Sequence, residues 1–280
     1  MSNRDSAVIA EAPRDISFGN DDFERIRRLI RERAGIALND SKRQMAYSRL
    51  SRRVRATGTG SFANYLDRLE RDGGDEWQEF INALTTNLTS FFREQHHFPV
   101  LLEFARNHMK ANGKPPRLWC SAASTGEEPY SIAMTLDEAG CGNARMIASD
   151  IDTNVLAQAA RGVYKSESTQ SLDANRLRRY FMRGTAANSG LVRVRPELRK
   201  MIEFRQVNLL DASWNLGDAF DVIFCRNVMI YFDKPTQHSI LEKFARVLRP
   251  GGLLFAGHSE NFSDFHGPFV LRGKTVYERR

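Results

Sequence analysis

The stretch that decides the fold is Trp119-Cys120-Ser121-Ala122-Ala123-Ser124-Thr125-Gly126-Glu127-Glu128-Pro129-Tyr130. An apolar run leads into a turn of small residues, and Pro129 stands near the first position of the expected helix. Small side chains let a ligand approach the backbone, while two adjacent carboxylates would repel a phosphate. The stretch therefore predicts a strand, turn and helix that suit a ligand with a cationic amine. An ordinary turn with an acidic first helical turn stays open as the alternative.

Downstream of residue 97, apolar runs alternate with stretches of helical period. Strands are predicted at 118–120, 146–148, 220–225 and 253–256, and helices at 130–139, 155–160 and 237–248. This alternation predicts parallel strands joined by crossover helices. Residues 270–271 and 276–277 flank Gly273 and predict a closing hairpin. The pattern breaks between about 162 and 205, where the alternating segment 191–195 predicts an insertion of short antiparallel strands.

The region from Phe18 to about Ser90 has a helical period throughout. We therefore expect a loose tail (1–17), an all-α N-terminal domain (18–90) and an α/β domain (91–280) that contains the insertion. Between residues 25 and 55 lie eleven basic residues and two acidic ones. On the helix expected to end near residue 56, Arg49, Arg52 and Arg53 face away from the apolar stripe. This face is either merely solvated or a docking surface for an acidic partner.

Composition excludes several classes of protein. The chain has 280 residues, 41% of them hydrophobic, with a net charge of +7, which indicates a folded domain pair and not a disordered chain. The sequence contains no run of about 18 apolar residues, so we predict no membrane span. The three cysteines form no C-x-x-C pair, so we expect no disulfide framework and a reducing, cytoplasmic location. Because no cysteine or carboxylate is expected at ligand spacing from His96-His97, no metal site is predicted.

Polar residues follow the predicted strands, at the edge where open α/β sheets bind ligands. Asp150 ends the second strand, where it can accept hydrogen bonds from two ribose hydroxyls, and Asp152 is expected to cap the next helix. Asn208 is a weaker candidate for contact with an adenine edge. Arg226 and Asn227 end a later strand, with Tyr231 one turn beyond. The segment 86–94, at the junction of the two domains, suits a lid over a pocket.

Together these features resemble a class I (Rossmann-like) S-adenosylmethionine-dependent methyltransferase, with helices on both faces of the sheet. Five segments narrow the resemblance to the CheR family of chemotaxis receptor methyltransferases. They are Thr85-Thr86-Asn87-Leu88-Thr89-Ser90-Phe91-Phe92-Arg93-Glu94, Ala123-Ser124-Thr125-Gly126-Glu127-Glu128-Pro129-Tyr130-Ser131, Ala148-Ser149-Asp150-Ile151-Asp152, Phe224-Cys225-Arg226-Asn227-Val228-Met229-Ile230-Tyr231-Phe232 and Gly257-His258-Ser259-Glu260-Asn261-Phe262. They occur in the family's order between residues 18 and 277. Ala122-Ala123 depart from the glycines that many methyltransferases have in the first turn.

The resemblance implies transfer of a methyl group from S-adenosylmethionine to glutamate side chains of chemoreceptors, which yields S-adenosylhomocysteine. It implies that the cofactor contacts are Asn87, Thr89, Arg93, Glu128, Asp150, Asn208, Leu209, Arg226 and Asn227. It implies that Arg93 and Tyr231 position the substrate in catalysis. The implied partner is the cytoplasmic helical region of a chemoreceptor, docked on Arg49, Arg52 and Arg53. A receptor C-terminal peptide is expected to add as a strand to the insertion, at 191–195.

Two other functions remain open from the sequence. The basic charge suits a nucleic-acid methyltransferase, although no N-P-P-Y motif or basic stripe with stacking aromatics is present. A non-catalytic, cofactor-sensing module is the second alternative, disfavoured by the intact Arg93, Asp150, Asn227 and Tyr231. We expect a monomer with no nucleic-acid partner and no direct membrane insertion.

Overall fold

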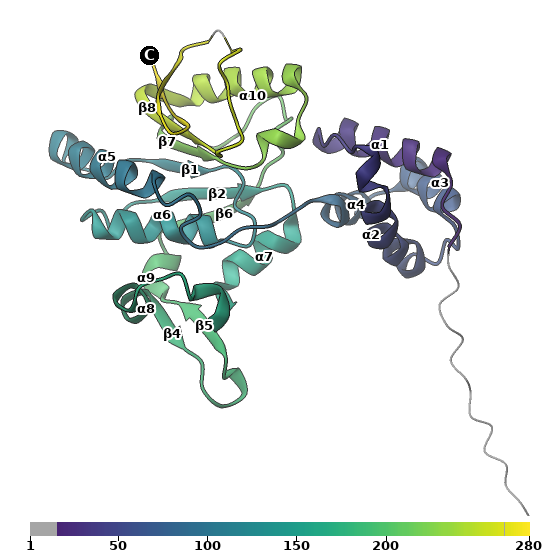
Figure 1. Cartoon of the computed structure of the whole chain (residues 1–280), viewed down its shortest axis with the longest axis horizontal. Helices are drawn as coiled ribbons and strands as arrows, with labels where there is room; N and C mark the ends of the chain where they lie inside the picture. Colours follow the sequence, from purple (N-terminus) through teal and green to yellow (C-terminus); the bar gives the residue numbers. More distant parts are fainter. Residues whose placement is uncertain (1–15, 266) are drawn as a thin grey trace, which may run out of the picture.

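The computed structural model describes residues 16–265 and 267–280, so the predicted tail lies largely outside the described residues (Figure 1). The N-terminal part is helical, as predicted. It contains α1 (Asn20–Ala34), the 3₁₀ turn η1 (Asp40–Lys42), α2 (Arg43–Ala56), α3 (Phe62–Asp72) and α4 (Glu76–Leu84). Their apolar faces form one core, in which Ile26, Leu50, Phe62 and Phe80 are fully buried.

A mostly parallel sheet forms the centre of the second part of the chain. Its strands are β1 (Leu118–Cys120), β2 (Met146–Asp150), β6 (Ile202–Gln206), β7 (Phe220–Cys225), β8 (Leu248–Ala256), β9 (Phe269–Gly273) and β10 (Val276–Arg279), in the order β6-β2-β1-β7-β8-β10-β9. Strands β6, β2, β1, β7 and β8 are parallel, and β10 and β9 form the predicted antiparallel hairpin. Strand β6 was expected within the insertion of about 162–205, but it pairs with β2 in the main sheet. Only two of its five residues, Ile202 and Phe204, are apolar, so its sequence gives a weak strand signal.

Helices cover both faces of the sheet, and alternate strand residues contact each layer. Cys120, Ala148 and Phe224 pack in a core with residues of α5 (His97–Asn112) and α6 (Glu127–Glu138). Trp119, Ile147 and Ile223 face the opposite core, which includes residues of α10 (Lys234–Val247). The crossover helix α7 (Thr153–Arg161) follows β2. This period of two in the strands confirms the predicted three-layer α/β architecture.

The predicted antiparallel insertion is present below the sheet in Figure 1. Its strands are β3 (Val163–Lys165), β4 (Phe181–Arg183) and β5 (Leu191–Val194), accompanied by η2 (Ser166–Thr169), α8 (Ala174–Tyr180), η3 (Ala186–Asn188) and α9 (Pro196–Arg199). The order β3-β5-β4 places β5 in the middle. The expectation that 191–195 offers a free strand edge is therefore wrong, because β5 is paired on both sides and the outer strands are β3 and β4.

The helical part is seated on the carboxyl edge of the sheet by polar contacts between distant segments. The Ala37 N–H donates to the Tyr231 carbonyl at 2.9 Å, and Arg31 forms an ion pair with Asp233 at 2.6 Å. Gly35 ends α1 with a φ of 70°, and a Cβ there would lie 2.8 Å from the Phe232 ring. The close approach of the helical part to the sheet thus depends on glycine at residue 35, which has no Cβ.

Among the described residues, none of the helices combines the length and apolarity that crossing a bilayer requires.

Gly35→Ala tests this contact between the two parts of the chain. Gly58 is the matched control, since its φ is 66° but nothing lies within 4 Å of an added Cβ. The left-handed conformation costs an alanine about 1–2 kcal/mol at either position. At residue 35 the contact with Phe232 adds about 1 kcal/mol or more. Chemical unfolding of both variants measures the difference, and equal losses of stability would contradict the expected contact.

Candidate functional site

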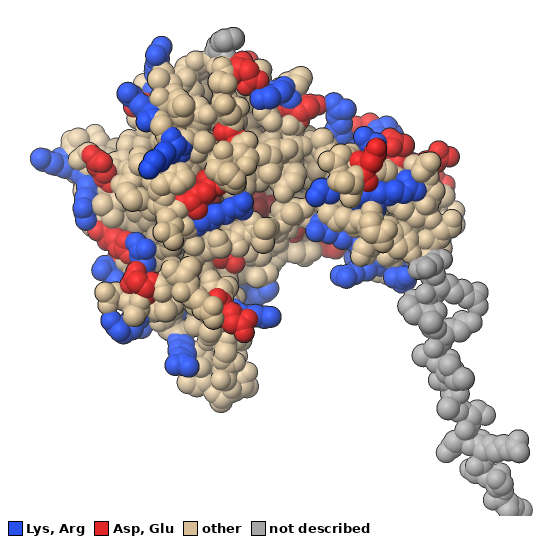
Figure 2. Space-filling model, viewed as in Figure 1, with Lys and Arg blue, Asp and Glu red and all other residues tan. Residues whose placement is uncertain are grey.

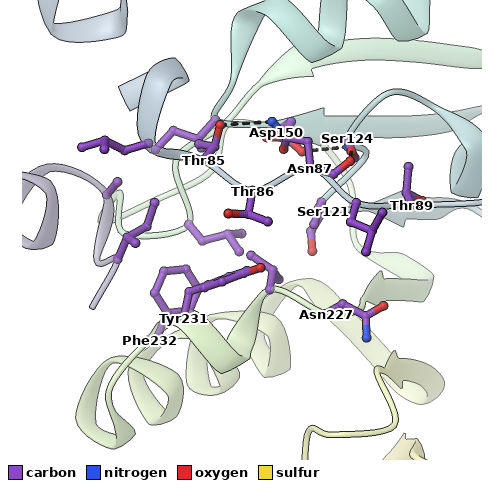
Figure 3. A pocket seen from close by; sticks show the side chains of 18 of the residues that line it. Thr85, Thr86, Asn87, Thr89, Ser121, Ser124, Asp150, Asn227, Tyr231 and Phe232 are labelled. Atoms are coloured by element: carbon purple, nitrogen blue, oxygen red, sulfur yellow. Dashed lines mark hydrogen bonds between the residues drawn. The ribbon is translucent and has the colours of Figure 1, made fainter. Parts of the chain in front are cut away.

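A cavity that opens to solvent lies where β1, β2 and β7 end, between the sheet and the helical part. The segment 85–93 crosses it (Figure 3). The structure brings together around this cavity all the residues predicted to bind cofactor or act in catalysis, namely Asn87, Thr89, Arg93, Glu128, Asp150, Asn208, Leu209, Arg226, Asn227 and Tyr231. Figure 3 shows the Tyr231 hydroxyl pointing into the cavity.

Asp150 ends β2 with its carboxylate at the cavity wall. Its Oδ2 accepts the Ser124 N–H at 2.8 Å and its Oδ1 accepts the Asp152 N–H at 3.0 Å. Burial raises the pKa of Asp150 to about 6, with the neighbouring Asp152 adding to the rise and the backbone donors opposing it. Each carboxylate oxygen has a second lone pair. Asp150 therefore has acceptor capacity left for a ligand in the cavity.

The crossing segment is tied to the sheet through Asp152. Thr85 Oγ1 and Asn87 Nδ2 donate to Asp152 Oδ2 at 2.6 and 2.8 Å. The other oxygen of Asp152 accepts two N–H groups at the start of α7, which confirms its predicted role as a helix cap. Further along the segment, Arg93 Nη1 donates to the Leu88 carbonyl at 2.9 Å. One buried carboxylate thus fixes both α7 and the lid segment.

A buried ion pair joins β7 to the start of α6. Arg226 Nη1 lies 2.6 Å from Glu128 Oε2, and the Arg226 side chain is fully buried. Burial raises the pKa of Glu128, and the attraction of Arg226 opposes the rise. Of the two adjacent carboxylates in the turn, Glu128 lines the cavity, whereas Glu127 accepts a hydrogen bond from Thr125 at 2.6 Å. The wall here therefore presents a paired anion and cation.

Glu94 contacts several groups beside this ion pair. Its Oε1 accepts from Asn227 Nδ2 at 3.2 Å and lies 3.0 Å from His258 Nδ1, while Oε2 is 3.3 Å from Arg226. Burial disfavours its charged form, but the hydrogen bonds from His258 and Asn227 and the attraction of Arg226 lower the pKa of Glu94 to about 2. The carboxylate is therefore ionised at neutral pH.

The position of Glu94 contradicts the expectation that no carboxylate stands at ligand spacing from His96 and His97. Ligand atoms of Glu94, His96 and His97 lie within 4.8 Å of one another, so a carboxylate does stand at ligand spacing from the histidine pair. The cation next to Glu94 is the Arg226 guanidinium, which opposes a metal ion at the same carboxylate. The cluster is local in sequence, since Glu94 precedes His96 by two residues and His97 by three.

The opposite wall comes partly from the helical part of the chain. Ile36, Leu38, Lys42 and Met45 line the cavity, and the sequence analysis identified none of them. The one sequence feature near these residues is the helix break at Gly35, which predicts a loop after α1 but does not predict contact with the cavity. Asn208 Nδ2 donates to the Arg33 carbonyl at 2.8 Å, and its Oδ1 accepts the Leu210 N–H at 3.0 Å. In this structure the Asn208 carboxamide therefore joins the two parts of the chain.

The three arginines expected to dock a partner differ in their surroundings. Arg49 donates to the carbonyls of Ala83 and Thr85, at the end of α4. Arg53 binds Glu76 at 2.5 Å and lies 3.4 Å from Glu79. Arg52 is exposed. In Figure 2 acidic side chains lie among the basic ones of the helical part, so the basic excess is partly neutralised within the domain.

Comparison with known proteins gives one consistent result. The family described as "CheR methyltransferase, all-alpha domain" matches residues 21–85, and "CheR methyltransferase, SAM binding domain" matches residues 87–277. The "Chemotaxis protein methyltransferase" of Salmonella typhimurium is 53% identical over 276 residues, which cover 97% of this chain and 94% of that protein. The Escherichia coli K12 protein of the same description is 51% identical, with 97% and 95% covered. "Chemotaxis protein methyltransferase 2" of Pseudomonas aeruginosa is 51% identical, with 94% of each covered. The chain belongs to the CheR methyltransferase family.

Proposed function

We propose that this chain transfers the methyl group of S-adenosylmethionine to glutamate side chains of chemoreceptors, forming glutamyl methyl esters. The observation that supports the proposal best is the cavity in which all ten predicted site residues meet. Family membership makes the chain an S-adenosylmethionine-dependent methyltransferase of chemotaxis. The glutamate acceptor, the roles of single residues and a cytoplasmic, monomeric state are parts of the proposal.

The donors and acceptors around the cavity fit S-adenosylmethionine. The free lone pairs of Asp150 suit the two ribose hydroxyls. Ile36, Leu38 and Leu209 offer apolar surface for the adenine. Glu128 and Arg226 present opposite charges that match the ammonium and carboxylate of the methionyl group. These assignments place the ribose near β2 and the methionyl group near β7.

The reaction needs no general base from the protein. A free glutamate carboxylate has a pKa of about 4.3 and is ionised at neutral pH. When bound, S-adenosylmethionine supplies an electrophilic methyl carbon: the acceptor oxygen forms a bond to it, the carbon–sulfur bond breaks, and its electron pair stays on sulfur. No proton is transferred. The chain's residues therefore align the acceptor and exclude water, as alignment alone can lower a barrier by several kcal/mol, up to about 7–11.

Arg93 and Tyr231 are the proposed groups that position the acceptor. A carboxylate that enters the cavity loses water and needs a compensating donor. Tyr231 lines the cavity with its hydroxyl directed inward, and Arg93 reaches the same space from the lid segment. Because Arg93 Nη1 already donates to Leu88, its guanidinium has other N–H groups left for a single contact. A single contact orients the nucleophile with less loss of reactivity than a bidentate pair.

The docking of the receptor is proposed to use exposed basic side chains of the helical domain. Of the three arginines expected from sequence, Arg52 is exposed and forms no ion pair with any residue that the structure describes, so it can meet an acidic receptor helix, whereas Arg49 and Arg53 bind within the helical domain. Lys42 is exposed and also lines the cavity. A receptor C-terminal peptide would have to add to β3 or β4, the outer strands of the insertion.

Labelled methyl transfer to a purified cytoplasmic receptor fragment tests the function, and the product must be base-labile because it is a carboxyl ester. In single turnovers, we expect Tyr231→Phe and Arg93→Ala to be slower by roughly tenfold or more, since a hydrogen bond to a charged group contributes about 1.5–3 kcal/mol. Tyr277→Phe is the matched control, because that hydroxyl accepts the Phe262 N–H away from the cavity. Label on RNA instead of receptor would refute the function. Wild-type rates and cofactor affinity in both variants would refute the residue roles.

Cofactor affinity is expected to fall in acid through Asp150. The pKa of this buried carboxyl is about 6, so it is ionised above that pH and protonated below it. Protonation removes an acceptor that the ribose hydroxyls need, and affinity should fall about tenfold between pH 7.5 and pH 5. Calorimetry from pH 5 to 8 measures the affinity for S-adenosylhomocysteine, which lacks the sulfonium charge of the cofactor. Asp150→Asn should bind weakly with little pH dependence between pH 5 and 8. Equal wild-type affinity at pH 5 and 7.5 would contradict the role of Asp150.

Receptor docking is expected to depend on the charge of Arg52. Arg52→Glu should raise the KM for receptor by about three- to tenfold at low salt, and the difference from wild type should shrink at high salt because exposed charges are screened. The KM for cofactor should stay unchanged. Arg246→Glu, an equal charge change on an exposed residue of α10, is the control. Equal effects of the two variants, or an effect of Arg52→Glu that persists in high salt, would contradict docking on this face.

A further inference from the structure

The loop after β7 supplies three groups to the cavity, and its backbone is unusual. Arg226, Asn227 and Tyr231 all lie within seven residues of the strand end. Asn227 has a φ of 58°, the left-handed conformation, which asparagine adopts more readily than other residues that carry a side chain. Within residues 16–265 and 267–280, no helix or strand carbonyl accepts the N–H groups of residues 227–229, so these groups need another acceptor.

The acceptor is Glu260, whose side chain is 3% exposed. Its Oε1 accepts the N–H groups of Val228 and Met229 at 2.9 and 2.7 Å. Its Oε2 accepts the N–H of Asn227 at 3.0 Å and that of Gly257. Four backbone donors thus converge on one carboxylate, two on each oxygen. Among the common side chains only an ionised carboxylate accepts at both ends, whereas a glutamine would turn an NH₂ group toward two N–H donors.

The contact joins the ends of two neighbouring parallel strands. Glu260 follows β8, which ends at Ala256 and is paired with β7. A Cβ on Gly257 would lie 2.8 Å from the backbone nitrogen of Asn227, so glycine is needed for the approach. The backbone of the β7 loop is therefore pressed against the end of β8, with Glu260 between them.

A second carboxylate holds the side chains of the same loop. Glu94 accepts from Asn227 Nδ2 at 3.2 Å and lies 3.3 Å from Arg226. Glu260 contacts only backbone N–H groups of this loop and does not line the cavity. An effect of Glu260 on the reaction must therefore act through the loop that it holds.

We propose that Glu260 is a positioning residue for methyl transfer: its carboxylate fixes the loop after β7 in the conformation that keeps Asn227 at the cavity wall and directs the Tyr231 hydroxyl into the cavity before any ligand binds. This inference rests on the proposed function, because it assumes that Asn227 contacts the cofactor and Tyr231 the acceptor. It adds a residue to which the sequence analysis gave no role.

Glu260→Gln tests the proposal. A displacement of about 1 Å can cost ~100-fold in rate, so we expect cofactor affinity and kcat each to fall by at least about tenfold. The matched control is Glu76→Gln, since Glu76 also accepts several hydrogen bonds, from Arg53 and Tyr65, but lies in the helical domain. The control should lower Tm while S-adenosylhomocysteine affinity stays within about twofold of wild type. A folded Glu260→Gln protein with wild-type affinity and kcat would overturn the proposal.

Hydrogen exchange in the unmodified protein gives an independent measurement if Glu260→Gln does not fold. The amides of residues 227–229 and 257 should exchange slowly without ligand, because all four donate to Glu260. Rapid exchange of these amides, at the rate of an open loop, would overturn the proposal. Failure of the wild-type protein to methylate receptor would refute the proposed function instead, so the two failures are distinguishable.

Discussion

A carboxylate that is removed from water must accept hydrogen bonds or face a cation, and this constraint organises the whole carboxyl edge of the sheet. Asp152 binds the lid segment and the start of α7. Glu260 binds the loop after β7, and Glu128 faces Arg226. Asp150 accepts the N–H groups of Ser124 and Asp152, one on each oxygen, and its remaining lone pairs are the proposed acceptors for the ribose hydroxyls.

The cavity exists only because three distant parts of the chain meet. The sheet supplies the polar edge, the segment 85–93 crosses it, and the helical domain adds an apolar wall that includes Leu38. The Ala37–Tyr231 backbone bond places the helical domain directly beside the proposed acceptor-binding tyrosine. Receptor docking on the helical domain would therefore bring the acceptor glutamate to the cavity by a short path. The architecture accounts for methyl transfer by alignment, without an acid–base residue.

The sequence predicts best those features that depend on neighbouring residues. The placement of Asp150 at a strand end and of Asp152 as a helix cap follows from the residues next to them in sequence, and the structure shows both placements. Features set by distant contacts were missed. A helical projection puts Arg49 and Arg53 on the polar face of α2, but it cannot show that α4 packs there and binds both. Alternation identifies β5 as a strand without revealing that it has neighbours on both sides. The four donors of Glu260 come from two segments about 30 residues apart, beyond the reach of local patterns.

The central claim is that the cavity holds the adenosyl ligand between Asp150 and the loop after β7. A crystal structure of the chain grown with S-adenosylhomocysteine tests it most directly. We predict that both ribose hydroxyls lie within hydrogen-bond distance of the Asp150 carboxylate and that the homocysteine end lies beside Glu128 and Asn227. A ligand bound elsewhere, or a cavity without ligand at saturating concentration, would contradict the account.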